Sequence, residues 1–162
     1  GDESAATAAA RALNLEAIDE TRIRSSQAGL AASKVAALPA VRAVLRHAQR
    51  AFAADPAGAI LDGRDIGTVI CPDAGVKLFV TASLEERTRR RLSELKARGE
   101  TITFEDLKAQ IAERDRRDTE RAESPLRQAP DAHLLDTTDL SIEAAVEAAC
   151  RFVDAALKRP GA

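Results

Sequence analysis

Apolar and alanine positions recur at helical spacing through the first third of the chain, which predicts three helices. Residues 3–13 and 19–36 are rich in good helix formers. A third helix is expected over residues 39–54, because Pro39 suits the first turn of a helix and the apolar positions after it keep the helical period. Turn-forming residues at 55–58 end this helical region.

Beyond residue 58, short apolar runs alternate with longer amphipathic stretches. The runs at 59–62, 76–81 and 133–135 are predicted strands, each too short and too apolar for a surface helix. Strands that alternate with helices imply parallel pairing through right-handed crossovers. The predicted fold class is therefore α/β, a parallel sheet flanked by helices. Three strands are few for a parallel sheet covered on both faces, so we expect strands to be missing.

Helix boundaries in the second half carry local signals. Ser83 and Glu86 have the spacing of a capping box, which predicts a helix that runs from there to Gly99. Residues 103–121 form another helical, highly charged stretch, and Ser141 opens a last helix.

Composition narrows the function classes. The chain has 162 residues, 45% of them hydrophobic and 31% charged, which fits one globular domain. A net charge of −2 and the absence of Tyr and Trp disfavour a nucleic-acid partner. No apolar run is long enough for a membrane span, so no membrane role is expected. The two cysteines and two histidines lack the spacing of a metal site, and a cytoplasmic location is the simplest expectation.

The segment ILDGRDIGT at 60–68 places charged side chains at the end of a predicted strand. Asp62, Arg64 and Asp65 would lie at the carboxyl edge of the sheet, where ligands bind in open α/β folds. There Asp62 would sit near Mg²⁺, Arg64 would hold a phosphate and Asp65 would accept hydrogen bonds. The alternative is an Asp-Gly turn with an ion pair on the surface.

A second segment, ERDRRDTER at 113–121, places charges on one helix face. Arg114, Asp118 and Arg121 follow each other at helical spacing, so that two guanidinium groups flank a carboxylate. Such a face binds a phosphate through the arginines and a sugar hydroxyl through the carboxylate. The alternative is a solvated helix whose internal ion pairs contribute about 0.2–0.5 kcal/mol each.

Arginines also cluster on the helix expected after Ser83. Arg87, Arg90 and Arg91 lie close on one surface, and their mutual repulsion calls for a counter-ion such as a polyphosphate. A solvated cationic helix is the alternative interpretation.

Together these segments resemble the bacterial cytidylate kinase family of P-loop nucleoside monophosphate kinases. The resemblance rests on SKVAALPAVRAVLRHAQRAF at 33–52, ILDGRDIGTVICPDAGVKLFVTAS at 60–83, FEDLKAQIAERDRRDTERAESPL at 104–126 and HLLDTTDLSIEAAV at 133–146. It implies phosphoryl transfer from ATP to CMP or dCMP, giving ADP and CDP or dCDP, with Mg²⁺.

The resemblance also implies roles for individual residues. Ser33 and Asp65 would contact the cytosine, Arg121 the base, and Asp118 the ribose hydroxyls. The arginines expected at the CMP phosphate are Arg42, Arg64 and Arg114. Among all of these, Arg64, Asp62 and Arg114 are the expected catalytic set, and Arg87, Arg90 and Arg91 belong to a lid that closes over ATP.

One family motif does not occur in these 162 residues. The phosphate-binding pattern GxxxxGK(S/T) is absent, so the resemblance implies a chain without the N-terminal P-loop segment and its strands. We therefore expect the 162 residues alone not to catalyse the transfer. The alternatives are a non-catalytic nucleotide-binding fragment and a helical interaction domain.

The expected organisation is one kinase domain. Residues 1–56 would be a CMP-binding helical region, and 57–162 a core α/β region with a lid at about 87–122. A monomer is expected, unless another chain supplies a missing strand.

Overall fold

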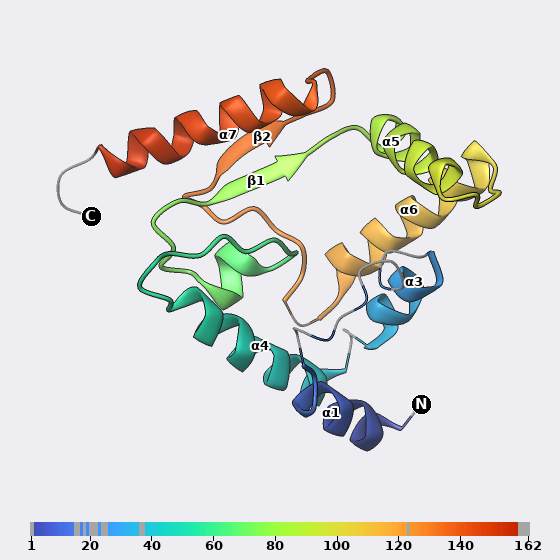
Figure 1. Cartoon of the computed structure of the whole chain (residues 1–162), viewed down its shortest axis with the longest axis horizontal. Coiled ribbons are helices and arrows are strands. Elements are labelled where there is room, and N and C mark those ends of the chain that lie inside the picture. Colours follow the sequence, from blue (N-terminus) through green and yellow to red (C-terminus); the bar gives the residue numbers. More distant parts are fainter. Residues whose placement is uncertain are drawn as a thin grey trace. The chain divides into compact units, whose positions relative to one another are not determined.

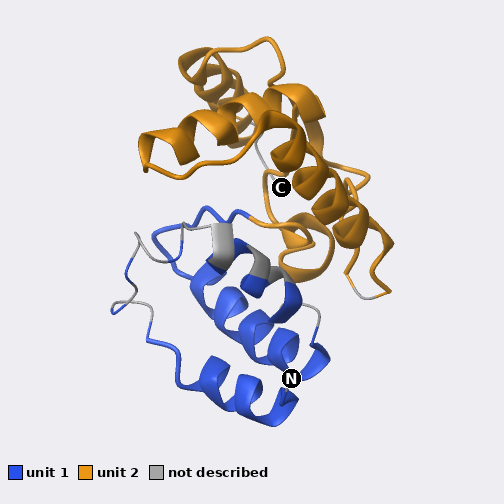
Figure 2. Ribbon diagram, turned by 90° about the vertical axis from the view of Figure 1, so that its right-hand side faces the viewer, with its two compact units in different colours: residues 1–62 blue, residues 63–162 orange. Residues whose placement is uncertain are grey.

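Two compact units make up the chain. The computed structural model describes residues 2–14, 17, 19, 23, 26–35, 38–122 and 124–158. Its units are Gly1–Asp62 and Gly63–Ala162, drawn in separate colours in Figure 2. This division reflects only how compactly the chain is folded. The functional division of the chain into a CMP-binding region and a core with a lid stays a prediction.

The first unit is helical in its described part. It contains α1 (Glu3–Arg11), α3 (Ser26–Val35) and α4 (Pro39–Ala53), so the three predicted helices are present, although part of the stretch 19–36 lies outside the described residues. Local chemistry explains their starts: the carboxylate of Asp2 accepts hydrogen bonds from the first turn of α1, and α4 begins with a proline. Val41 of α4 is 1% exposed and belongs to the core of this unit.

The second unit is built around a small parallel sheet. Strand β1 (Leu78–Thr81) pairs with β2 (His133–Asp136), with Leu78 opposite His133 and Thr81 opposite Asp136. Helices α5 (Leu84–Ala97) and α6 (Phe104–Glu120) lie between these strands in the sequence, and α7 (Ile142–Leu157) follows β2 and lies beside it in Figure 1. Parallel pairing through a helical crossover confirms the predicted α/β class.

The prediction of a strand at 59–62 is wrong. The sheet of the described residues consists of β1 and β2, and the run at 59–62 forms no strand. Ile60, at its centre, is 97% exposed. A strand exists only where a neighbouring strand satisfies its backbone groups, and the described residues offer this run no such neighbour.

Helices α5 and α6 lie side by side (Figure 1). Leu95 of α5 and Leu107 of α6 are buried, as is Thr88, whose hydroxyl donates to the carbonyl of Leu84 over 2.7 Å. The chain reverses between the helices at Gly99, whose φ of +77° lies in the left-handed region that glycine adopts without strain. The predicted end of α5 at this glycine is confirmed.

The capping box at the start of α5 is only half formed. Ser83 Oγ accepts a hydrogen bond from the backbone N–H of Glu86 over 3.2 Å, as predicted. The backbone N–H of Ser83, however, donates to Oγ1 of Thr138 over 2.8 Å, and the carboxylate of Glu86 turns to Arg89 and Arg90. Two guanidinium groups compete for this carboxylate, and charged donors make the stronger hydrogen bonds.

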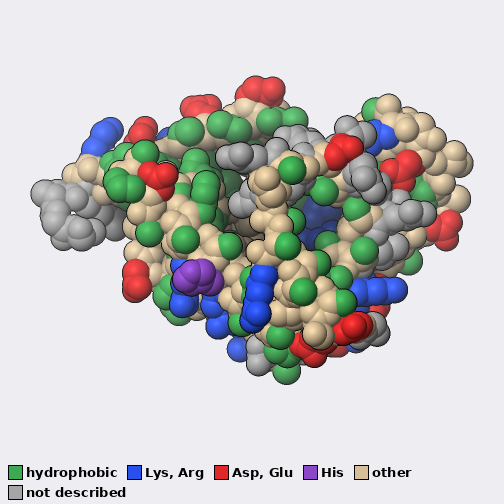
Figure 3. Space-filling model, turned by 60° about the horizontal axis from the view of Figure 1, so that its bottom comes forward, with side chains coloured by type: hydrophobic (Ala, Val, Ile, Leu, Met, Phe, Trp, Pro, Cys, Tyr) green, Lys and Arg blue, Asp and Glu red, His purple; other side chains and the backbone are tan. Residues whose placement is uncertain are grey.

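The surface carries both signs of charge. On the face seen in Figure 3, acidic and basic side chains are scattered among apolar ones. This fits the net charge of −2. Among the described residues, no helix has both the length and the hydropathy required to cross a membrane.

Candidate substrate site

A π-helix follows directly on Arg64 and Asp65. This element, η2 (Ile66–Ile70), was not predicted. The backbone N–H of Ile70 donates to the carbonyl of Asp65 over 3.2 Å, and that of Cys71 donates to the carbonyl of Ile66 over 2.7 Å. Both bonds span five residues, the spacing of a π-helix, an element that is frequent at functional sites. Because its carbonyl is held at the start of η2, the backbone of Asp65 has a fixed orientation, and Asp65 is 8% exposed.

Gly63 allows the chain to fold tightly before this element. A Cβ atom added to Gly63 would lie 2.9 Å from Cδ1 of Ile66, closer than carbon atoms normally approach. The side chain of Ile66 therefore packs against the glycine itself. Arg64 lies between Gly63 and Ile66 in the sequence, so its backbone belongs to this tight segment.

Asp118 on α6 is surrounded by three arginines. Nε of Arg64 donates to Oδ2 of Asp118 over 3.0 Å. Nε of Arg114 lies 3.9 Å from the same oxygen, and Nη1 of Arg121 lies 3.8 Å from Oδ1. The side chain of Asp118 is only 12% exposed. The structure thus brings together four residues that the sequence placed in two separate segments.

Arg121 is oriented by the loop that follows α6. Its Nε donates to the carbonyl of Ser124 over 2.5 Å, and the backbone N–H of Leu126 donates to the carbonyl of Asp118 over 2.7 Å. Ser124 has a φ of 52°, in the left-handed region, where the chain turns back toward the helix. Arg121 therefore lies at the end of α6 in a conformation that the loop determines.

Two guanidinium groups of this cluster keep donors available for a ligand. The terminal nitrogens of Arg64, and all the guanidinium nitrogens of Arg114, form no hydrogen bond with any described residue. Three cations face one carboxylate here, so the cluster has an excess of positive charge. This arrangement suits an oxyanion, which a guanidinium group can bind with two parallel hydrogen bonds.

Arg87 and Arg91 have partners within the chain. Nη1 of Arg87 lies 2.6 Å from Oδ2 of Asp115 on α6, and its Nε donates to the carbonyl of Ala82 over 3.0 Å. Arg91 pairs with Glu94 at 2.8 Å. The expectation that these arginines need an external counter-ion is therefore wrong, because carboxylates of α5 and α6 supply the opposite charge. Whether they also reach ATP stays a prediction.

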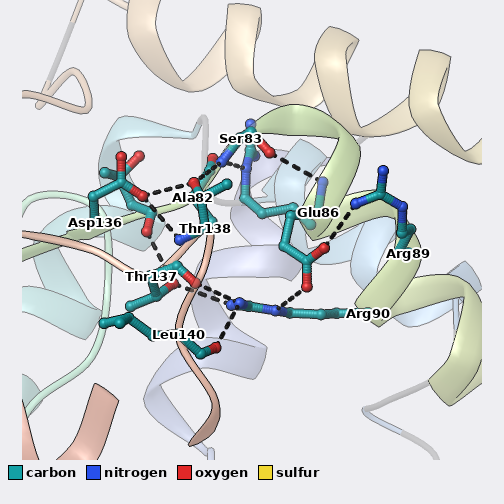
Figure 4. A network of polar contacts seen from close by, with 11 residues as sticks. Ala82, Ser83, Glu86, Arg89, Arg90, Asp136, Thr137, Thr138 and Leu140 are labelled. Carbon is teal, nitrogen blue, oxygen red and sulfur yellow. Dashed lines mark hydrogen bonds and ion pairs between the residues drawn. The ribbon is translucent and has the colours of Figure 1, made fainter. Parts of the chain in front are cut away.

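Arg90 connects α5 to the loop after β2 (Figure 4). It donates to Oγ1 of Thr137 over 3.1 Å and to the carbonyl of the same residue over 2.5 Å. Its Nε donates to the carboxylate of Glu86 over 3.0 Å. Hydrogen bonds from Arg89 and then Arg90 lower the pKa of Glu86 below its ordinary value. In this structure Arg90 ties two elements together. Its partner Thr137 is far away in the sequence, so no local pattern signals the contact.

Three expected site residues belong to the first unit. Arg42 lies on α4 and is partly buried, and Asp62 is exposed at the end of the unit. Ser33 lies within α3, and its side chain is outside the described residues. Their part in the site stays a prediction.

Comparisons with known proteins agree with the resemblance. The model of the cytidylate kinase family matches residues 4–155. The cytidylate kinases of Brucella ovis and Brucella suis are 55% identical to this chain over 156 residues, which cover 96% of the chain and 71% of each relative. The cytidylate kinase of Brucella abortus is 54% identical over the same shares. A match over almost the whole chain, with the DGRD and ERDRRDTER segments meeting at one carboxylate, shows that the chain belongs to the cytidylate kinase family.

Proposed function

We propose that the chain provides the CMP site for phosphoryl transfer from ATP to CMP or dCMP, and that Arg64, Arg114, Asp118 and Arg121 form this site. The observation that carries the site is the single carboxylate of Asp118 among three guanidinium groups. Membership in the cytidylate kinase family supports the reaction.

Arg64 and Arg114 would hold the phosphate of CMP. Phosphoryl transfer requires little covalent chemistry from the protein, and most of the catalysis comes from positioning and charge stabilisation. Asp118 accepts a hydrogen bond from Nε of Arg64, which fixes the plane of that guanidinium group. The two terminal nitrogens can then bind two phosphate oxygens, which reduces the repulsion between the phosphates of the two nucleotides.

Asp65 and Arg121 would recognise the nucleoside. A carboxylate accepts a hydrogen bond from the exocyclic amino group of cytosine, which uracil lacks. Asp65 is 8% exposed and its backbone is held by η2, so its side chain has little freedom. Asp118 would reach the ribose hydroxyls, while Ser33 and Arg42 stay the residues that the resemblance implies at the cytosine and at the CMP phosphate.

The donor side of the reaction would involve ATP and Mg²⁺. Within the described ranges, no group of three or more His, Cys, Asp or Glu side chains could hold a metal ion. Mg²⁺ is commonly bound by substrate phosphates and one or two carboxylates, and it would come with ATP. Arg87, Arg90 and Arg91 would approach ATP as part of a lid, and Asp62 stays the expected acidic residue near the reacting phosphates.

The test combines binding and turnover on the 162-residue chain. Calorimetric titration with CMP should show binding, and Arg64→Gln should weaken it by about tenfold or more, as expected for a lost charged hydrogen bond. Arg116→Gln is the matched control, since Arg116 lies on the same region of α6 but pairs with the exposed Glu113 and Glu120. Equal CMP affinity in the two variants would contradict the assignment of the site.

A second candidate is a nucleotide-binding protein without turnover. It is favoured by the absence of GxxxxGK(S/T) from these residues, since that motif supplies the cradle and the lysine for the ATP phosphates. A coupled assay that detects ADP formation from ATP and CMP distinguishes the two. CMP binding without ADP formation would favour the second candidate for the chain as given.

A further inference from the structure

Lys77 is a buried lysine just before β1. Its side chain is 8% exposed, whereas lysines are almost never buried unless they are paired. Its ammonium group donates to the carbonyl of Pro72 and lies 2.6 Å from Oδ2 of Asp131. The hydrogen bond from Lys77 lowers the pKa of Asp131 below its ordinary value. The ammonium group thus joins the segment after η2 to the loop before β2.

The aliphatic part of the same side chain supports η2 itself. A Cβ atom added to Gly67, within η2, would lie 3.2 Å from Cδ of Lys77 and 3.7 Å from Cβ of Ala129. Ala129 is 5% exposed. The lysine stem therefore lies on the side of Gly67 where a side chain would begin, and a side chain at this position would push the stem away by a few tenths of an ångström.

The backbone of Lys77 is fixed by the sheet. Its carbonyl accepts a hydrogen bond from the N–H of His133 over 2.9 Å, at the start of the β1–β2 pairing. A rigid strand end therefore holds the stem against Gly67 and the ammonium group against Pro72. No other described lysine has a side chain this deeply buried in an ion pair: the side chain of Lys108, which pairs with Glu85, is 31% exposed.

We propose that Lys77 is a positioning residue for the substrate site, which holds η2 and thereby sets the direction of Arg64 and Asp65. The stem of the side chain lies beside Gly67 within η2, and the ammonium group holds the carbonyl of Pro72 just after η2. In turn, η2 holds the carbonyl of Asp65. Lys77 itself is not part of the proposed CMP site. The role in substrate binding rests on the proposed function, while the contact with η2 does not.

The first measurement is amide hydrogen exchange in the chain without ligand. Lys77→Met keeps the stem and removes the ammonium group, and Lys108→Met is the control for losing an exposed lysine. The amides of Ile70 and Cys71 report on η2, because both close its five-residue hydrogen bonds. We expect their exchange to be about tenfold faster in Lys77→Met and within twofold of wild type in Lys108→Met. Unchanged exchange in Lys77→Met would overturn the inference.

The second measurement is the ratio of CMP to UMP dissociation constants. Lys77→Met should weaken CMP binding and lower the discrimination against UMP severalfold, because Asp65 moves with η2, and Lys77→Arg should restore part of both. A purely structural lysine would lower the melting temperature and leave the ratio unchanged, which would refute the positioning role. A wild-type chain that binds neither nucleotide would contradict the proposed function, while the exchange measurement would still decide whether Lys77 holds η2.

Discussion

Nε of Arg64 donates to Oδ2 of Asp118 over 3.0 Å, and this contact joins the segment before η2 to the last turns of α6. The two residues come from the two most characteristic segments of the sequence. One edge of the guanidinium group is used inside the protein, and the other edge is left for a ligand. The contact therefore determines the position and the orientation of the guanidinium group that we propose for the CMP phosphate.

Asp118→Asn should destabilise the chain. The substitution keeps the shape of the side chain but leaves three guanidinium groups without their carboxylate. Breaking a buried ion pair costs about 3–5 kcal/mol, and we expect roughly 1–3 kcal/mol here because the side chain of Arg64 is 38% exposed. Chemical denaturation measures the change in the free energy of unfolding.

Inorganic phosphate provides a second readout for the same variant. An anion that enters the cluster replaces the lost carboxylate, so millimolar phosphate should raise the melting temperature of Asp118→Asn more than that of wild type. Glu113→Gln, which neutralises an exposed carboxylate on the same helix, is the control. An equal response in all three proteins would show that the arginines do not act as one anion site.

Arg64→Lys should impair the enzyme although it keeps the positive charge. An ammonium group cannot bind Asp118 and two phosphate oxygens in one plane, so we expect a loss of about 1.5–3 kcal/mol in CMP binding. Calorimetry on the chain gives this value directly. The companion variant Arg116→Lys should bind CMP like wild type. If the kinetics or CMP affinity of Arg64→Lys lay within twofold of wild type, Arg64 would be a surface residue without a role in binding phosphate.

Asp65→Asn should change base selectivity more than phosphate affinity. An amide can donate to uracil, whereas a carboxylate repels that edge, so discrimination between CMP and UMP should fall by about 1–3 kcal/mol. The measurement is the ratio of kcat/KM, or of dissociation constants, for the two nucleotides. A ratio equal to that of wild type would remove Asp65 from the base-binding role.

Glu86 should make the stability of α5 depend on pH in the acid range. Hydrogen bonds from Arg89 and Arg90 lower its pKa in the folded chain, so its stabilising contribution is complete above the ordinary value of 4.5. That contribution is lost as the pH falls from 4.5 through the lowered value. In Glu86→Gln, the melting temperature should therefore fall less steeply than in wild type over this interval.

Local signals predicted the helices well, because their causes are local. Ser83, Gly99 and Ser141 act on the turn in which they lie, and they mark helix boundaries in the structure. The apolar runs also located β1 and β2. The run at 59–62 is also apolar, but no strand lies beside it among the described residues, so its apolar character alone led to a wrong prediction.

The sequence singled out the four residues that gather at Asp118 but not the contacts that join them. The helical spacing of Arg114 and Asp118 placed them on one face, and the DGRD segment supplied Arg64. No local rule shows that Asp118 pairs with Arg64 as well as with Arg114, or that Arg90 donates to Thr137. The contacts of Arg64 with Asp118 and of Arg90 with Thr137 span about fifty positions of the sequence. The π-helix was missed because the pattern of apolar residues carries no signal that separates five-residue hydrogen bonds from those of an ordinary helix.

The five-residue hydrogen bonds of η2 also make the length of the chain itself a constraint. An α-turn would use one residue fewer to close the same loop, so η2 contains one residue that ordinary helical geometry does not need. If that residue were deleted, every position between η2 and β1 would advance by one, and a shift of one residue in a strand exchanges its two faces. The carbonyl of Lys77 accepts the hydrogen bond of His133 at the start of the β1–β2 pairing, so this shift would put Leu78 in its place. Homologous chains with this element should therefore vary in residue type between Asp65 and Leu78 but not in the number of residues.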